Sequence, residues 1–226
     1  AIKFQTFMPS EMTLNSNKKN FLINEKKSLW YGKNLYKLYK KSSMPWEWQK
    51  KLFSYAKNLG LIAFSSPFGT SSLNFLKKIK CPIYKIASLE NSHFQLIGKV
   101  VKTKKPIILS TGSASIEEIE RTVKFINKLG CKNLTLLKCT STYPSKFEDL
   151  NLKSLKTLKN KFKCRVGFSD HSIGIEASLA AVALGAEVIE KHVKLSNKDK
   201  SIDSKFSITP DQLKDMVNKS EIIKKS

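Results

Sequence analysis

The sequence predicts an α/β fold, a TIM-type (β/α)8 barrel of which this chain holds a part. Short apolar runs alternate with amphipathic stretches, with about 30 residues per repeat, the length of a β-α unit. An open, doubly wound sheet is the alternative, but such a sheet is expected to carry a GxGxxG or GxxxxGK phosphate loop, and the sequence has neither. With 226 residues, 41% of them hydrophobic, the chain can bury a substantial core.

Seven apolar runs predict seven parallel strands. Each run is rich in Ile, Val, Leu or Phe and stops at polar residues. The runs lie at residues 1–7, 61–68, 83–88, 106–112, 133–141, 164–171 and 186–193. An eight-stranded barrel needs one strand more. Because the chain begins on a strand, we expect the missing β-α unit to be the first, so that these runs are strands two to eight.

Amphipathic stretches between the runs predict helices outside the sheet. One stretch opens with a capping box between Ser115 and Glu118, continues with apolar residues at helical spacing, and ends at Gly130. Another begins after Thr209, an N-cap residue, with Pro210 in its first turn. These signals place helices after the fourth and the last of the seven runs.

Residues 8–45 break the repeat. They form a long polar insertion with interspersed aromatic residues. Loops after barrel strands often carry function. The insertion is therefore either a lid over a site or a solvated excursion.

The chain is strongly basic, with a net charge of +23, and 39 of its 41 basic residues are lysine. Proteins that read nucleic acid specifically use arginine forks and aromatic platforms. The lysines are instead spread over most of the predicted helices, which is typical of a solvated surface. Nucleic-acid binding is therefore a remote alternative, and we expect no nucleic-acid partner.

Cysteine usage and hydropathy predict a cytoplasmic protein. The four cysteines show no CxxC pair and no metal-ligand spacing, and each lies in or beside an apolar segment: Cys81, Cys131, Cys139 and Cys164. Buried, reduced thiols are the expected state. No apolar run approaches the roughly 20 residues that a membrane helix needs, so we expect no membrane partner.

Two of the three histidines end consecutive apolar runs. Parallel neighbouring strands lie about 4.8 Å apart, so His171 and His192 can point into the same barrel mouth. Two converging imidazoles suit a borderline divalent metal with open positions for water and substrate. A pair of hydrogen-bonded core histidines is the alternative. The third histidine, His93, reads as a helix-surface residue.

Two lysines lie on predicted strands. A lysine on the inner face of a barrel strand costs desolvation unless an anion meets it, and Lys3 and Lys85 both face this problem. Together with the serines at the strand ends they suit a ligand with a phosphate and a carboxylate. Two alternatives stay open: the side chains snorkel to solvent at the strand ends, or one of the lysines forms a Schiff base in an aldolase.

Several motifs resemble the sialic acid synthase family, whose members condense phosphoenolpyruvate with an amino sugar to make nine-carbon 2-keto acids. The resemblance covers essentially the whole chain in order. It rests on "SSPF", "YKIAS", "PIILSTG", "CTSTYP", "GFSDHSIGI" and "ALGAEVIEKH". Within the family, "PSEMTLNS", "SSPFGTSSLNFLKK", "KCTSTYP" and "DSKFS" look most like the branch that makes pseudaminic acid.

The resemblance implies a role for each candidate site residue. His171 and His192 match the metal ligands, usually of manganese, with magnesium or cobalt as alternatives. Glu90 matches a carboxylate near the phosphoenolpyruvate pocket, and Tyr143 and Asp203 match residues near the sugar. The residues that match the phosphoenolpyruvate pocket itself are Lys3, Lys85, Ser88, Ser110 and Ser169.

Of these, the residues expected to take part in catalysis are Lys3, Lys85, Glu90, Tyr143 and Asp203. Ser141, a candidate for substrate binding, departs from the asparagine that is typical of the N-acetylneuraminate enzymes.

The implied reaction joins phosphoenolpyruvate to a diacetamido-trideoxy hexose of the altrose type, with release of phosphate. The alternative is an N-acetylneuraminate or legionaminate synthase that uses an N-acetylmannosamine-type sugar. Family members begin with a further strand that carries a catalytic Glu. They commonly end in an antifreeze-like domain that lends an Arg to the partner subunit. We therefore expect residues 1–226 to be a partial barrel without that C-terminal domain, inactive alone, and part of a homodimer at full length.

Overall fold

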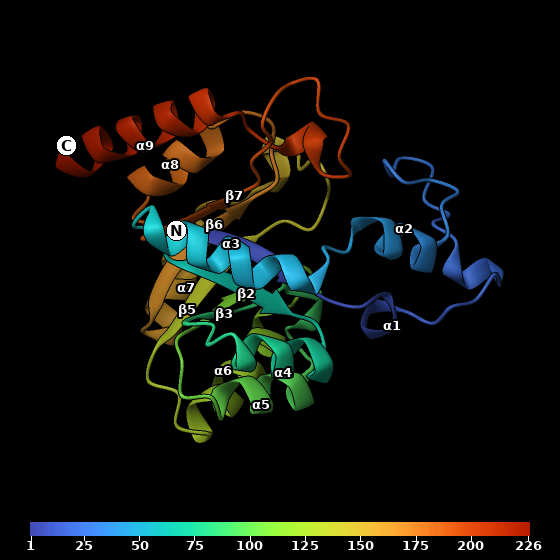
Figure 1. Cartoon of the computed structure of the whole chain (residues 1–226). Coiled ribbons are helices and arrows are strands. Elements are labelled where there is room, and N and C mark those ends of the chain that lie inside the picture. Colours follow the sequence, from blue (N-terminus) through green and yellow to red (C-terminus); the bar gives the residue numbers. More distant parts are fainter. The chain divides into compact units, whose positions relative to one another are not determined.

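The computed structural model describes all 226 residues and confirms the α/β class and the seven predicted strands (Figure 1). The strands neighbour one another in chain order in one sheet, and the pairs described residue by residue are parallel. They are β1 (Ile2–Thr6), β2 (Ala63–Pro67), β3 (Tyr84–Ile86), β4 (Ile107–Ser110), β5 (Leu134–Cys139), β6 (Arg165–Asp170) and β7 (Val188–Lys191).

Helical crossovers explain why the strands run parallel, since each strand must return to the same edge before the next begins. The crossover and terminal helices are α3 (Trp46–Asn58), α4 (Thr70–Lys78), α5 (Phe94–Val101), α6 (Ile116–Lys128), α7 (Ser154–Phe162), α8 (Glu176–Ala183) and α9 (Pro210–Lys225). No helix combines the length and apolar character needed to cross a membrane.

The two predicted helix starts are confirmed. At α6, the Ser115 amide donates to Glu118 Oε2 at 2.8 Å and the Glu118 amide donates to Ser115 Oγ at 3.3 Å, which is the predicted capping box. Gly130 follows the helix with φ of 82°, a conformation that glycine adopts without strain. At α9, Thr209 caps the helix and Pro210 occupies the first turn.

The chain divides into two compact units. The first unit comprises residues 1–108 and 125–133, and the second comprises residues 109–124 and 134–226. In the first unit, α4 and α5 bury their apolar faces together with β3. The side chains of Leu73, Leu76, Ile86 and Ile97 are almost wholly excluded from solvent. In the second unit, Phe168 on β6 is fully buried in a cluster with residues of α7 and α8.

The insertion at residues 8–45 belongs to the first unit and contains α1 (Pro9–Met12), the 3-10 turn η1 (Lys19–Phe21) and α2 (Leu35–Ser42). Its first turn is anchored, because the Ser72 amide at the start of α4 donates to Glu11 Oε1 at 3.0 Å. Just past its other end, Trp46 Nε1 donates to the Phe7 carbonyl at 3.3 Å. Between these anchors, Leu14 and Tyr31 are exposed. The insertion is thus solvated in its middle and fastened at both ends.

All four cysteines are free thiols, as the sequence predicts. Cys81 and Cys139 are buried, whereas Cys131 and Cys164 are half-buried. Burial raises the pKa of Cys81 to about 11, so this thiol stays protonated at neutral pH and acts as a small apolar side chain.

Candidate active site

The two histidines at the ends of β6 and β7 lie together in the second unit, with ring centroids 5.5 Å apart. His171 Nδ1 is 3.2 Å from the Thr140 carbonyl oxygen. His192 Nδ1 faces Asp203 Oδ2 at 3.5 Å. The structure therefore brings together three residues that the sequence places at the site, from two strand ends and the segment after β7.

These contacts set which nitrogen of His171 can bind a ligand. A carbonyl oxygen only accepts hydrogen bonds, so the Thr140 contact places the proton of a neutral imidazole on Nδ1 and leaves a lone pair on Nε2. A metal-binding histidine is typically held in this way, with its second nitrogen on a carbonyl or carboxylate. His192, which faces Asp203, follows the same pattern. No group of three or more His, Cys, Asp or Glu side chains is clustered for metal binding. The donor set that fits a divalent metal ion here is the two imidazoles, with water and substrate as the remaining ligands.

Aromatic rings surround the histidine pair. Tyr143 packs on His171 with centroids 4.5 Å apart. Phe206, in the 3-10 turn η4 (Ser204–Phe206), is 1% exposed. Its ring lies 5.4 Å from Tyr143, 5.8 Å from His171 and 5.1 Å from His192. Sequence reasoning missed Phe206 as a site residue, although it lies within the quoted motif "DSKFS".

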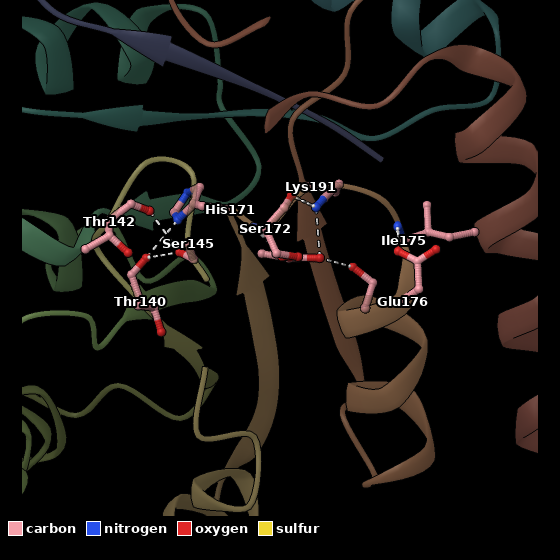
Figure 2. Close-up of polar contacts among 10 residues, drawn as sticks. Thr140, Thr142, Ser145, His171, Ser172, Ile175, Glu176 and Lys191 are labelled. Atoms are coloured by element: carbon pink, nitrogen blue, oxygen red, sulfur yellow. Dashed lines mark hydrogen bonds and ion pairs between the residues drawn. The ribbon is translucent and has the colours of Figure 1, made fainter. Parts of the chain in front are cut away.

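The loop after β5 is hydrogen-bonded to His171, the residue that directly follows β6. The Ser145 amide donates to the His171 carbonyl at 3.0 Å. The Ser145 hydroxyl lies 2.8 Å from the Thr142 carbonyl and 3.2 Å from the Thr140 carbonyl (Figure 2). In the same loop, Ser141 Oγ is buried without a hydrogen-bond partner. A buried hydroxyl costs free energy when it is unsatisfied, so Ser141 remains a candidate for a substrate contact.

Two more predicted site residues lie in the second unit. Ser169 pairs in register with Glu190, and its hydroxyl donates to Glu190 Oε1 at 2.8 Å. Because side chains alternate along a strand, Ser169 lies on the same face of β6 as His171. Ser110, buried, ends β4.

The remaining predicted residues lie in the first unit: Lys3, Lys85, Ser88 and Glu90. Lys85 on β3 is 2% exposed, and its Nζ donates to the Ile86 carbonyl at 3.1 Å. The side chain does not snorkel to solvent, so the structure contradicts that alternative for Lys85. Lys3 on β1 is half-buried.

Glu90 ends the 3-10 turn η2 (Ser88–Glu90), and its Oε2 is buried without a hydrogen-bond partner. Burial raises the pKa of Glu90, and the nearby charge of Lys85 opposes the shift only in part. The insertion also brings Tyr39 near Glu90. The pKa of Tyr39 is raised by burial and by the charge of Glu90. Tyr39 was not among the sequence candidates, since only the path of the insertion brings it near a residue so distant in sequence.

Replacing Glu90 with glutamine should stabilise the protein at neutral pH, because the glutamine removes a charge that is buried with incomplete compensation. We expect the free energy of unfolding to rise by about 1 kcal/mol. A carboxyl whose pKa is raised by folding loses relative stability as pH rises through that pKa. The gain should therefore be smallest below the ordinary pKa of a glutamate and grow as pH rises. Urea unfolding from about pH 4 to pH 8 tests this. Glu148→Gln, at an exposed carboxylate, is the control, and an equal gain in both variants would contradict the prediction.

In each of the two units of this α/β protein, polar side chains follow the carboxyl ends of parallel strands, the position at which proteins of this class carry their ligand-binding residues. The chain belongs to the NeuB family, whose model matches residues 1–226.

Relatives and a solved structure agree with this assignment. A pseudaminic acid synthase from Campylobacter jejuni is 46% identical over 96% of the chain. One from Helicobacter pylori is 44% identical over 100% of the chain. The chain spans 63% and 65% of the lengths of these two relatives. The crystal structure of an N-acetylneuraminic acid synthetase from Leptospira borgpetersenii, in complex with citrate, matches the whole chain and 73% of its own, with a TM-score of 0.88 and 34% identity.

Proposed function

We propose that this chain carries the catalytic barrel of a pseudaminic acid synthase, a transferase that forms a carbon–carbon bond. It would condense phosphoenolpyruvate with a diacetamido-trideoxy hexose of the altrose type and release phosphate. The observation that carries the proposal is 46% identity to a pseudaminic acid synthase along almost the whole chain. Seven parallel strands in chain order, joined by helices, support the partial TIM-type barrel.

Phosphoenolpyruvate is a small trianion at its most ionised, and we assign it to the lysines. Lys85 is buried on β3, so in the dry interior its charge acts far more strongly on a ligand than it would at the surface. Lys3, half-buried on β1, adds a second charge. Hydroxyl donors for the phosphate and carboxylate oxygens are assigned to Ser88, Ser110 and Ser169.

The bond changes balance without a redox step. C3 of phosphoenolpyruvate forms the new bond to the aldehyde carbon of the open-chain sugar, and the aldehyde oxygen takes a proton to become a hydroxyl. Water then adds to C2 and gives up a proton. The C2–O bond to phosphate then breaks while the new C2 hydroxyl gives its proton to the leaving phosphate, which leaves inorganic phosphate and a 2-keto group. Glu90, whose pKa is raised by burial, is the carboxyl assigned to move one of these protons.

The histidine pair is assigned to a divalent ion and the residues around it to the sugar. His171 and His192 would hold manganese, or magnesium or cobalt, which would supply Lewis-acid polarisation of the sugar aldehyde. Tyr143 and Asp203, which contact these two histidines, would orient the sugar. The proposal includes a homodimer, as the resemblance implies, and a location in the cytoplasm, as cysteine usage predicts.

An N-acetylneuraminate or legionaminate synthase is the second candidate, and the match to the Leptospira structure favours it. The two candidates differ in the sugar. Ser141 stands where the N-acetylneuraminate enzymes typically have asparagine, which favours the altrose-type substrate.

The test is to give the complete protein phosphoenolpyruvate with manganese and either the altrose-type sugar or N-acetylmannosamine. We expect kcat/KM for the altrose-type sugar to exceed that for N-acetylmannosamine at least about tenfold, or 1.4 kcal/mol. Phosphoenolpyruvate carrying a heavy oxygen isotope in its C2–O–P bridge should yield labelled phosphate, since the C–O bond breaks. If neither sugar leads to phosphate release, the proposal is overturned. A preference for N-acetylmannosamine would select the second candidate.

A further inference from the structure

A buried ion pair lies directly behind the two site histidines. Asp170 is the last residue of β6 and Lys191 is the last residue of β7, directly before His171 and His192, and the two strands pair Asp170 with Lys191 in register. Lys191 Nζ lies 2.9 Å from Asp170 Oδ2, with the side chains 1% and 0% exposed. The ion pair faces α8, whose Ser178 contacts Asp170. Side chains alternate along a strand, so the alternation continued one residue past each strand end places the histidines on the other side.

Hydrogen bonds tie this pair to the surrounding backbone and to α8. Asp170 Oδ1 accepts from the amide and the hydroxyl of Ser172, at 2.8 and 2.7 Å, and Oδ2 accepts from the Ser178 hydroxyl on α8 at 2.7 Å. Lys191 Nζ donates to the Ser172 carbonyl at 2.6 Å. Figure 2 shows Lys191 and Ser172 between the loop of Thr140 to Ser145 and the helix that carries Glu176. The network thus links the end of β6, the end of β7 and α8.

Stability alone is a poor account of this network. A buried ion pair offers little over well-packed apolar side chains of similar size, because removing two charges from water offsets most of their attraction. Hydrophobic contact has no direction, whereas an ion pair with four further hydrogen bonds defines one arrangement. The arrangement it defines here is the register and spacing of the two residues that lead into His171 and His192.

We propose that Asp170 and Lys191 are positioning residues that hold His171 and His192 at the separation at which both can bind one divalent ion. Neither side chain contacts the ion or the substrate in this scheme. The inference rests on the metal site of the proposed function. It adds that the Asp170–Lys191 ion pair fixes the distance between the two metal-binding histidines. It requires that the affinity for the bare ion depend on a network on the far face of the sheet.

The test is the double variant Asp170→Asn with Lys191→Met in the complete protein, which removes both charges and leaves neither partner as a buried, unpaired ion. Manganese alone is titrated into the protein without substrate, and the free ion is followed by electron paramagnetic resonance. We expect manganese to bind about 10 to 100 times more weakly than to the wild type, the usual cost of removing groups that support metal ligands. The single variant Lys191→Arg, which keeps the positive charge, should lose less manganese affinity than the double variant.

A matched control separates positioning from general destabilisation. Leu158→Ala truncates a buried side chain on α7 that has no role in the network. We expect Leu158→Ala to lower the urea midpoint at least as far as the double variant does, yet to leave manganese affinity within about twofold of wild type. If the double variant does not fold, Ser178→Ala removes one hydroxyl donor to Asp170 and keeps both charges. It should weaken manganese binding about threefold or more.

The possible failures are distinguishable. Wild-type affinity in the double variant, or in Ser178→Ala where that variant replaces it, would overturn the positioning role and leave the metal site standing. An equal loss of affinity in Leu158→Ala would overturn it too, because the effect would then follow stability. A wild-type protein that binds no manganese would remove the proposed metal site and this inference with it.

Discussion

Replacing His171 with alanine should lower the turnover of the complete protein by about a thousandfold, or about 4 kcal/mol, the scale on which a Lewis-acid ion stabilises a transition state. The variant loses one of two imidazoles whose rings lie 5.5 Å apart. The remaining contacts of His192, with Asp203 and Phe206, do not replace a second nitrogen donor. Manganese content should fall together with turnover.

The chain offers a control of the same residue type. His93, exposed, occupies the N-cap position of α5 without a capping hydrogen bond from its side chain, in agreement with the predicted surface histidine. His93→Ala should leave metal content and turnover at wild-type values. Unchanged metal content and turnover in His171→Ala would remove the metal site from the proposed function, while a thousandfold loss with full metal content would assign His171 to substrate binding instead.

Replacing Lys85 with methionine should raise the KM for phosphoenolpyruvate at least about tenfold, or 1.4 kcal/mol. Methionine has nearly the length of lysine, so it removes the charge without leaving a large cavity. Because the lysine is 2% exposed, its removal also relieves the cost of a buried ammonium. We therefore expect the variant to keep its fold and to lose affinity for the anionic substrate.

The control is Lys99→Met on α5, at an exposed lysine, which should leave the KM unchanged. Borohydride distinguishes this electrostatic role from covalent catalysis. If Lys85 formed a Schiff base, reduction in the presence of a keto substrate would trap an adduct on the wild type but not on Lys85→Met. Such an adduct would contradict the binding role and restore the aldolase alternative. We expect none.

Local sequence patterns predicted most of the secondary structure of this protein. All seven apolar runs became strands, and the capping box at Ser115 and the cap at Thr209 began helices where they were predicted. These are local signals, since the residues that carry them lie within a few positions of the elements they specify. The candidate site residues were predicted in part from a similar rule, because polar residues at the ends of parallel strands are expected at one edge of a sheet.

The contacts that complete the site depend on tertiary structure. The partner of His192 is Asp203, which the segment after β7 returns to the strand end, and Phe206 comes with it. Tyr39 lies near Glu90 through the path of the insertion. The pairing of Asp170 with Lys191 exists only in the register of β6 and β7. Sequence patterns report which face a residue occupies. Packing alone decides which distant residue meets it there, because that choice depends on loop paths and strand register, which no local periodicity encodes.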